Sequence, residues 1–285
     1  MMADKVLGKG GNKTLLRMRT VDEMADALTA SQNDVNERNQ HRQSCRDRDG
    51  SFTGTRSSAE YADMLRNGWS EGVEGVEGLD GLSTDASDRI TFVRGVGGAF
   101  ANVPAYLSGA PDAMLMPVAA PADSVRGLTL VIDSSFHCGI TPADAKRYAQ
   151  SIMKLLAWLQ AEGIETAVYS VACINGADAK RMLYVSPIRQ AGDVMMPERV
   201  ASICHPSWLR RAWFAMCEQD YHVRSLPGTR CCSGSYGRPA TATTEELQQA
   251  IPEAYSVILL PKVGSGDPEQ AVREAYSLKL KLGEV

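Results

Sequence analysis

The stretch LTLVIDSS, residues 128–135, opens the segment that decides the fold of this chain. The apolar run Leu128–Ile132 is short and is bounded by Gly127 and Asp133. Such a run is typical of a strand that is buried on both faces, as in a parallel sheet. We therefore expect an α/β fold built around this strand.

A helix and a second strand should follow. Thr141 is a favoured N-cap, Pro142 suits the first helical position, and Asp144 lies three residues after the cap. Glu165–Cys173 carries valine, tyrosine and threonine, which favour a strand. Residues 128–173 therefore predict one parallel strand–helix–strand unit with a right-handed crossover.

Two more strands are predicted downstream. Met182–Ile188 follows a short turn, so it should form an antiparallel hairpin with the second strand. Pro187 lacks an N–H and should place this strand at the edge of the sheet. Tyr255–Leu260 should be a parallel neighbour in the same sheet, and Asp267 with Pro268 should open the last helix.

This order of elements, which covers about half of the chain, resembles the von Willebrand factor A fold. The resemblance implies a divalent metal held by Asp-x-Ser-x-Ser at the end of the first strand. Asp133 and Ser135 match two positions, but His137 replaces the last serine, and Mg²⁺ prefers oxygen ligands. We expect no functional metal and no cofactor, with Asp133 and Ser135 as weak candidates whose side chains instead cap the turn.

The sequence divides into three expected parts. These are a basic and polar N-terminal arm with a short helix at 1–56, a helical and extended segment at 57–126, and the von Willebrand factor A-like domain at 127–285.

Two sequence features predict the structure of the N-terminal parts. Ser57 and Glu60 predict a capping box for a helix that ends at Gly68, whereas residues 31–56 contain almost no large apolar side chain, as in a linker. Ile90–Val96 and Ala101–Leu107 should be strands or extended segments that pack beside the core.

Composition indicates a soluble protein of the cytoplasm. The chain has 285 residues, a net charge of −4 and 44% hydrophobic residues, which is ordinary for a globular protein. No apolar stretch is long enough for a membrane span, and no signal-peptide pattern is present. Seven cysteines without a Cys-x-x-Cys pair favour reduced thiols.

Positive charge gathers between residues 205 and 238. HPSWLRR at 205–211 should open a helix with Trp213 on its apolar face and the arginines toward solvent. The glycine-rich loop at 225–239 joins arginines to an aromatic residue, which suits single-stranded nucleic acid, although an ordinary surface loop has the same composition. The candidate nucleic-acid-binding residues are Arg210, Arg211, Arg224, Arg230, Tyr236 and Arg238.

A second resemblance rests on three sequence segments: NGWSEG at 67–72, VPAYLSGAP at 103–111 and HPSWLRR at 205–211. They look like those of a poorly characterised family of bacteriophages and mobile elements, which implies a phage origin. In some lytic phages a protein of this size binds single-stranded DNA and recruits the phage RNA polymerase. We expect that function, with single-stranded DNA and a phage polymerase or another protein as partners.

An enzyme is not expected. The four histidines are scattered, and no nucleophile elbow, zinc-protease helix or dinucleotide fingerprint appears. The alternative function is a protein-interaction or assembly module that presents loops at the carboxyl ends of its strands. A steep loss of binding with salt would favour nucleic acid over this alternative.

Overall fold

The structure is a computed structural model of the whole chain. It describes residues 5–7, 14–33, 50–79, 90–119, 127–136, 138–162, 164–175, 181–191, 193–219, 238–254 and 256–282. Among the helices in these ranges, none combines the length and the apolar character needed to cross a membrane.

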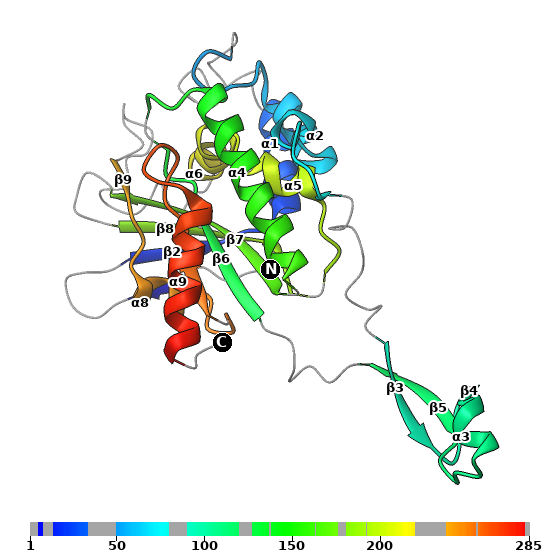
Figure 1. Ribbon diagram of the computed structural model, residues 1–285. Coiled ribbons are helices and arrows are strands. Elements are labelled where there is room, and N and C mark those ends of the chain that lie inside the picture. Colours follow the sequence, from blue (N-terminus) through cyan, green and yellow to red (C-terminus); the bar gives the residue numbers. More distant parts are fainter. Residues whose placement is uncertain are drawn as a thin grey trace.

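The main body has an α/β fold, in which a mixed β-sheet is covered by helices (Figure 1). Along the sheet the strands are β1 (Lys5–Leu7), β2 (Thr14–Met18), β8 (Arg181–Arg189), β7 (Glu165–Asn175), β6 (Gly127–Asp133) and β10 (Val257–Leu259). β6 pairs in parallel with both β7 and β10, as the apolar runs predicted. β9 (Arg238–Ala240) pairs with the last residues of β7, beyond the point where β6 has ended.

The predicted hairpin of β7 with β8 is confirmed, but the predicted edge position of β8 is wrong. β2 pairs in parallel with the other side of β8, from Arg181 to Val185. Pro187 lies beyond that pairing and next to the β-bulge at Val168 and Tyr169 of β7. The missing N–H is therefore tolerated because the neighbouring strand has already ended.

The two faces of the sheet bury separate cores. Leu128, Leu130 and Ile132 of β6 face helices, whereas Val131 points to the opposite core, as alternation along a strand requires. The first core contains residues of α1 (Val21–Asn33), α2 (Ser58–Asn67), α4 (Pro142–Ala161), α5 (Pro197–Ser202), the π-helix η6 (Trp208–Trp213) and α9 (Pro268–Leu282). The second core is completed by α8 (Thr244–Ala250).

The predicted helix starts are confirmed. Thr141 and Asp144 form a complete capping box at α4, and the Oδ1 atom of Asp267 accepts the N–H of Glu269 at the start of α9. α2 begins after Ser57 and ends at Gly68, whose φ of 92° is one that side chains avoid.

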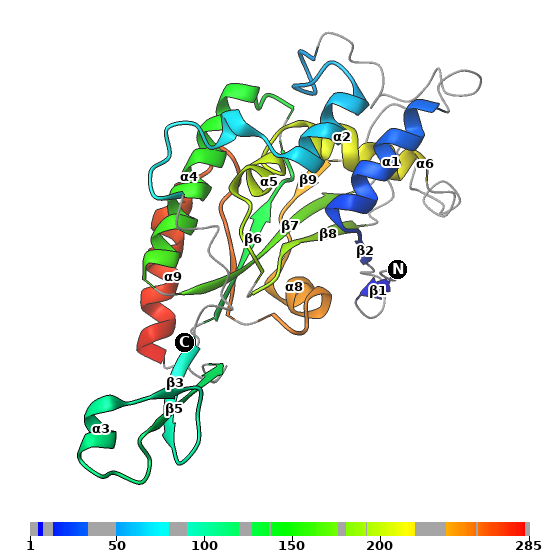
Figure 2. The same ribbon diagram turned by 90° about the vertical axis from the view of Figure 1, so that its right-hand side faces the viewer.

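The N-terminal segment differs from the expected arm, because β1, β2 and α1 belong to the main body (Figure 2). Several of their apolar residues, among them Leu16 and Met24, are fully buried. Residues 34–49, most of the expected linker, lie outside the described residues.

Residues 90–119 form a second, small sheet of β3 (Ile90–Gly95), β5 (Met114–Ala119) and β4 (Phe100–Ala101). The expected strand at 101–107 is mostly wrong: Asn102 caps the short helix α3 (Val103–Leu107), in which Pro104 is tolerated at the first turn. The expected packing beside the core is also wrong, because no described residue of this sheet joins either core. Both views show the small sheet apart from the main body (Figures 1 and 2).

Candidate functional site

The two central residues of the predicted nucleic-acid site are buried. Only 3% of Arg210 and 1% of Arg211 is exposed, so the prediction that they reach solvent is wrong. The Arg210 guanidinium donates hydrogen bonds to the carbonyl oxygen atoms of Ile140 at 3.1 Å and Cys138 at 3.3 Å. The Nε atom of Arg211 donates to the Oγ1 atom of Thr55 at 2.7 Å.

The burial of both arginines has a structural cause. The prediction assumed an α-helix, but residues 208–213 form a π-helix in which all six residues are buried. The loop that contains Phe52 and Thr55 covers its polar side, with the ring of Phe52 stacked 4.5 Å from the Arg210 guanidinium. These arginines hold the loop against the helix.

The other predicted contacts give the nucleic-acid site little support. Arg238 is exposed on β9. Arg224, Arg230 and Tyr236 lie outside the described residues, so their predicted role stays a prediction. Trp213 is buried, as its place on the apolar face predicted.

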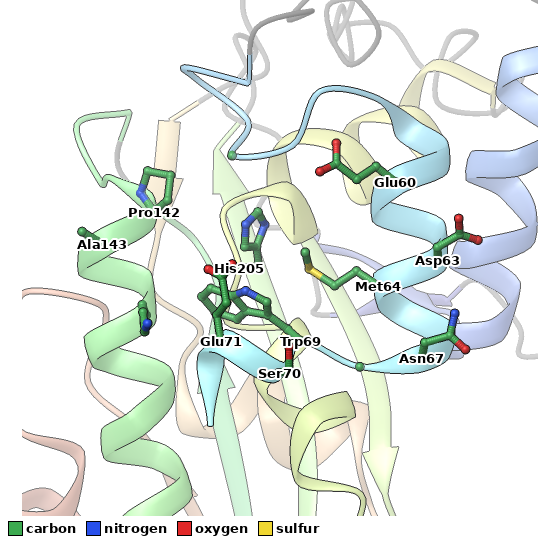
Figure 3. A pocket seen from close by; sticks show the side chains of 13 residues that line it. Glu60, Asp63, Met64, Asn67, Trp69, Ser70, Glu71, Pro142, Ala143 and His205 are labelled. Atoms are coloured by element: carbon green, nitrogen blue, oxygen red, sulfur yellow. The ribbon is translucent and has the colours of Figure 1, made fainter. Parts of the chain in front are cut away.

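His205 is a buried histidine that the sequence did not single out. Its ring lies between Tyr61, at 5.7 Å between ring centroids, and Trp69, at 4.8 Å. Burial, together with the charges of Arg210 and Arg211, lowers the pKa of His205 to about 3. The imidazole is therefore neutral at pH 7, and it lines a cavity next to α2 and α4 (Figure 3).

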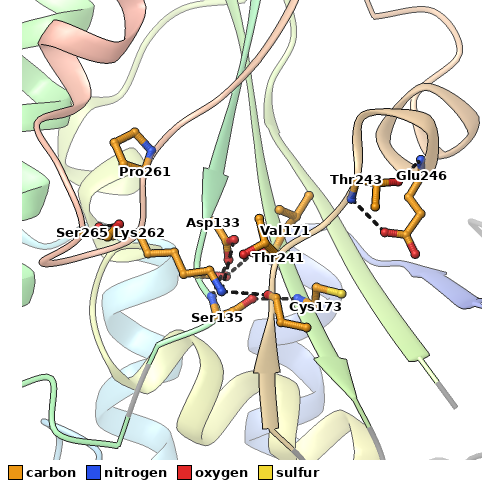
Figure 4. Close-up of polar contacts among 12 residues, drawn as sticks. Asp133, Ser135, Val171, Cys173, Thr241, Thr243, Glu246, Pro261, Lys262 and Ser265 are labelled. Atoms are coloured by element: carbon orange, nitrogen blue, oxygen red, sulfur yellow. Dashed lines mark hydrogen bonds and ion pairs between the residues drawn. The ribbon is translucent and has the colours of Figure 1, made fainter. Parts of the chain in front are cut away.

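A polar cluster marks the carboxyl end of β6 (Figure 4). The Oδ1 atom of Asp133 accepts the N–H of Ser135 at 2.9 Å, and the hydroxyl of Ser135 accepts the N–H of Cys173 at 2.8 Å. Both side chains are buried, and burial raises the pKa of Asp133. The two metal candidates thus lie together. Asp133 caps the turn as predicted, whereas Ser135 bonds the neighbouring strand β7 instead.

Lys262 is the residue of this cluster that sequence reasoning missed. Its Nζ atom lies 3.6 Å from the Oδ2 atom of Asp133 and donates to the carbonyl oxygen of Ala240 at 2.8 Å. Lys262 follows β10, the parallel neighbour of β6, so both strands end at the same edge of the sheet.

The cluster does not have the geometry of a nucleophile with its base. The hydroxyl of Ser134 lies 3.1 Å from that of Ser170, which accepts the indole N–H of Trp208 at 2.8 Å. His137 lies outside the described residues. Within the described ranges no three His, Cys, Asp or Glu side chains gather as metal ligands would.

The small sheet carries the most concentrated exposed apolar surface of the described residues. Ten large hydrophobic side chains are exposed in the parts of the chain that the structure describes, and six of them fall between residues 96 and 116: Val96, Phe100, Val103, Tyr106, Leu107 and Met116. Leu107 is 79% exposed and Tyr106 69%, both on α3. This exposure could not be predicted from the sequence, because the same residues would suit a buried strand.

Comparisons with known proteins identify the chain by family alone. No curated protein and no solved structure matches it. A family model described as "Domain of unknown function (DUF7192)" matches residues 5–283, nearly the whole chain, and the chain therefore belongs to this family.

Proposed function

We propose that the chain is an assembly module that binds a second copy of itself through the small sheet. In this proposal the main body is a von Willebrand factor A-like domain, and residues 90–119 carry the contact surface. The observation that carries the proposal is the concentration of exposed apolar side chains between Val96 and Met116. Contiguous exposed apolar patches mark interaction surfaces in folded proteins.

The size of the small sheet strengthens this inference. A segment shorter than about 40 residues seldom buries enough apolar surface to be stable without further support. Among the side chains of this sheet whose burial the structure describes, only those of Ala105 and Ala113 are buried, and both are small. A partner that covers α3 would remove Tyr106 and Leu107 from water and stabilise the sheet.

Charge and strand pairing favour a second copy as the occupant. The chain carries a net charge of −4, but Arg94 and Asp112 are the only charged residues in 90–119, and they pair at 3.1 Å. Two copies can therefore meet at this surface without like-charge repulsion. β3 is also an edge strand of its sheet, and unpaired edges accept strands from other chains.

The von Willebrand factor A-like reading is supported by strand order and by the strand-end cluster. β8, β7, β6 and β10 are consecutive, with β8 antiparallel to β7. In this reading Asp133 and Ser135 are remnants of a metal site, and the ammonium of Lys262 supplies the positive charge. A phage origin remains a proposal that rests on the three sequence phrases.

Single-stranded DNA binding is the weaker proposal. Arg210 and Arg211, the centre of the predicted interface, donate their hydrogen bonds inside the protein. A polymerase could also be recruited through the exposed apolar residues at 96–116, so this surface serves either partner.

Hydrogen–deuterium exchange of the full chain at low and high protein concentration tests the proposed surface. Amides of residues 90–107 should exchange more slowly at high concentration, because a second copy covers them. Amides of α8, on the opposite side of the main sheet from the first core, serve as the reference and should not change. Equal exchange of residues 90–107 at both concentrations would refute the proposed contact.

A further inference from the structure

The backbone of β5 determines which residues of β3 bond to it. The N–H of Asn102 donates to the carbonyl oxygen of Ala113 at 2.8 Å, in line with the pairing of β4 with β5. Backbone groups of successive residues point to opposite sides of a strand, so every second residue from Ala113 onward faces the side of β4, and the residues between them face β3. Pro117 belongs to the first set, where its missing N–H costs no bond, because β4 pairs only with Met114 and Leu115.

The same alternation leaves one row of β3 backbone groups without a partner among the described residues. β3 pairs with β5 along its whole length, with Gly95 opposite Met114. Because Met114 faces β3, every second residue back from Gly95 bonds to β5. The residues between them, Ile90, Phe92 and Arg94, direct their N–H and C=O groups to the outer side. Within the described ranges β3 has no other neighbouring strand, so this row forms an open edge.

We propose that two copies of the chain join these edges antiparallel, with a two-fold axis through Phe92. Their two three-stranded sheets then form one continuous sheet. This inference rests on the proposed association of two copies and names how they pair. Only outward-facing residues of the two copies can bond each other, so Phe92 can face Phe92 of the second copy but not Val93.

An axis through Phe92 is the one that uses the whole outward row. Ile90 then bonds with Arg94 of the second copy, and Phe92 bonds with its own equivalent. A shift of two residues in either direction leaves one outward residue of each β3 without a partner in the other. The axis through Phe92 also keeps like charges apart, since the two Arg94 residues lie about 13 Å from each other along the strands.

The joined sheet gathers exposed apolar side chains of both copies on one surface. Directly opposite residues of antiparallel strands point to the same face, so each face of one small sheet continues into the same face of the other. Met116 lies opposite Val93 on β5 and is 49% exposed. In the dimer the Met116 side chains of both copies therefore lie on the same face, one strand away from the junction.

Amide exchange of the ¹⁵N-labelled full chain, followed residue by residue by NMR, tests the pairing. At a concentration where about nine in ten chains are dimeric, the amides of Ile90, Phe92 and Arg94 should exchange about tenfold more slowly than in the monomer, because they open only in the free copy. The amides of Thr91 and Val93 bond to β5 in both states and should change much less. A dimer in which both rows slow equally, or neither slows, would overturn the edge pairing and leave the assembly proposal standing. A chain that forms no dimer overturns both.

Cysteine variants test the register. Directly opposite residues of antiparallel strands have Cα atoms about 5.5 Å apart, which a disulfide can span. Ile90→Cys and Arg94→Cys chains should therefore form a disulfide-linked dimer when mixed and oxidised. Neither should do so alone, because identical positions lie about 13 Å apart along the strands.

The native chain, oxidised in the same way, gives the background from its own seven cysteines. Linking of either variant with itself as readily as in the mixture would overturn the proposed axis. So would a mixture that dimerises in sedimentation but forms no link above the native background.

Discussion

The ammonium of Lys262 lies 3.6 Å from the Oδ2 atom of Asp133, at the edge of the sheet where β6 and β10 both end. Asp133 is wholly buried, and its Oδ2 atom has no hydrogen-bond partner among the described residues. The chain thus places its own cation beside a buried carboxylate, at the position where the sequence suggested a weakened metal site.

Lys262→Met should destabilise the protein by about 2 kcal/mol, because it leaves the Asp133 carboxylate buried without a positive charge. The double variant with Asp133→Asn should lose less than the sum of the two single changes, since the two residues interact. Urea denaturation of the four proteins measures this coupling.

The loss of stability in Lys262→Met should depend on pH, and the direction of that dependence is defined. Burial raises the pKa of Asp133, and Lys262 opposes that rise. The stability deficit of Lys262→Met should therefore shrink as the pH falls and the carboxyl group takes up a proton. A deficit that is constant with pH would show that Lys262 contributes through packing instead.

His205 should make the fold sensitive to mild acid. Its folded pKa of about 3 lies below the ordinary value of 6.5, so the unfolded chain binds the proton more readily. This contribution to stability is complete above about pH 6.5 and is lost as the pH falls toward 3, with a slope of at most about 1.4 kcal/mol per pH unit. His205→Gln should have a flatter pH profile in urea denaturation than the native protein. An NMR titration in which His205 takes up its proton near pH 6.5 would contradict the buried placement.

Arg211 should be a stability residue. Arg211→Ala should reduce the free energy of unfolding by about 3 kcal/mol, because the buried hydroxyl of Thr55 loses one hydrogen bond and a void remains. Arg238→Ala, at an exposed position, should change it by less than about 0.5 kcal/mol. Chemical denaturation of both variants measures the contrast, and similar losses would mean that Arg211 is not held as described.

Local sequence signals predicted the fold well where both partners lie near each other in the chain. The capping box of Thr141 and Asp144 spans three residues, and the β7–β8 hairpin is formed by neighbours in sequence. The pairing of β2 with β8 joins residues 167 positions apart, such as Thr14 and Arg181, and no periodicity reveals it.

The candidate site was predicted less well for the same reason. Arg211 is buried by Thr55, which lies 156 residues away, so a helical projection alone placed it in solvent. The sequence predicted that Asp133 and Ser135 lie together, because they are two residues apart in the chain. Lys262 was missed because its contact with Asp133 depends on the order of the strands.

Single-stranded DNA should bind weakly, because the two central arginines of the predicted interface are buried. Fluorescence anisotropy with a labelled oligonucleotide should show no saturable binding near physiological salt, since Arg210 and Arg211 do not reach a phosphate. Tight binding that weakens steeply with salt, and that is lost in a variant with Arg224, Arg230 and Arg238 changed to alanine, would restore the nucleic-acid proposal.

Sedimentation velocity across a protein concentration series tests the assembly proposal most directly. The native chain should form dimers as its concentration rises, and Tyr106→Ser with Leu107→Ser should remain monomeric, because both side chains leave the apolar surface of α3. Val6→Ser with Val194→Ser removes two exposed apolar side chains elsewhere and should dimerise like the native chain. A native chain that stays monomeric at every concentration, or a dimer that survives the change at Tyr106 and Leu107, would contradict the assembly proposal.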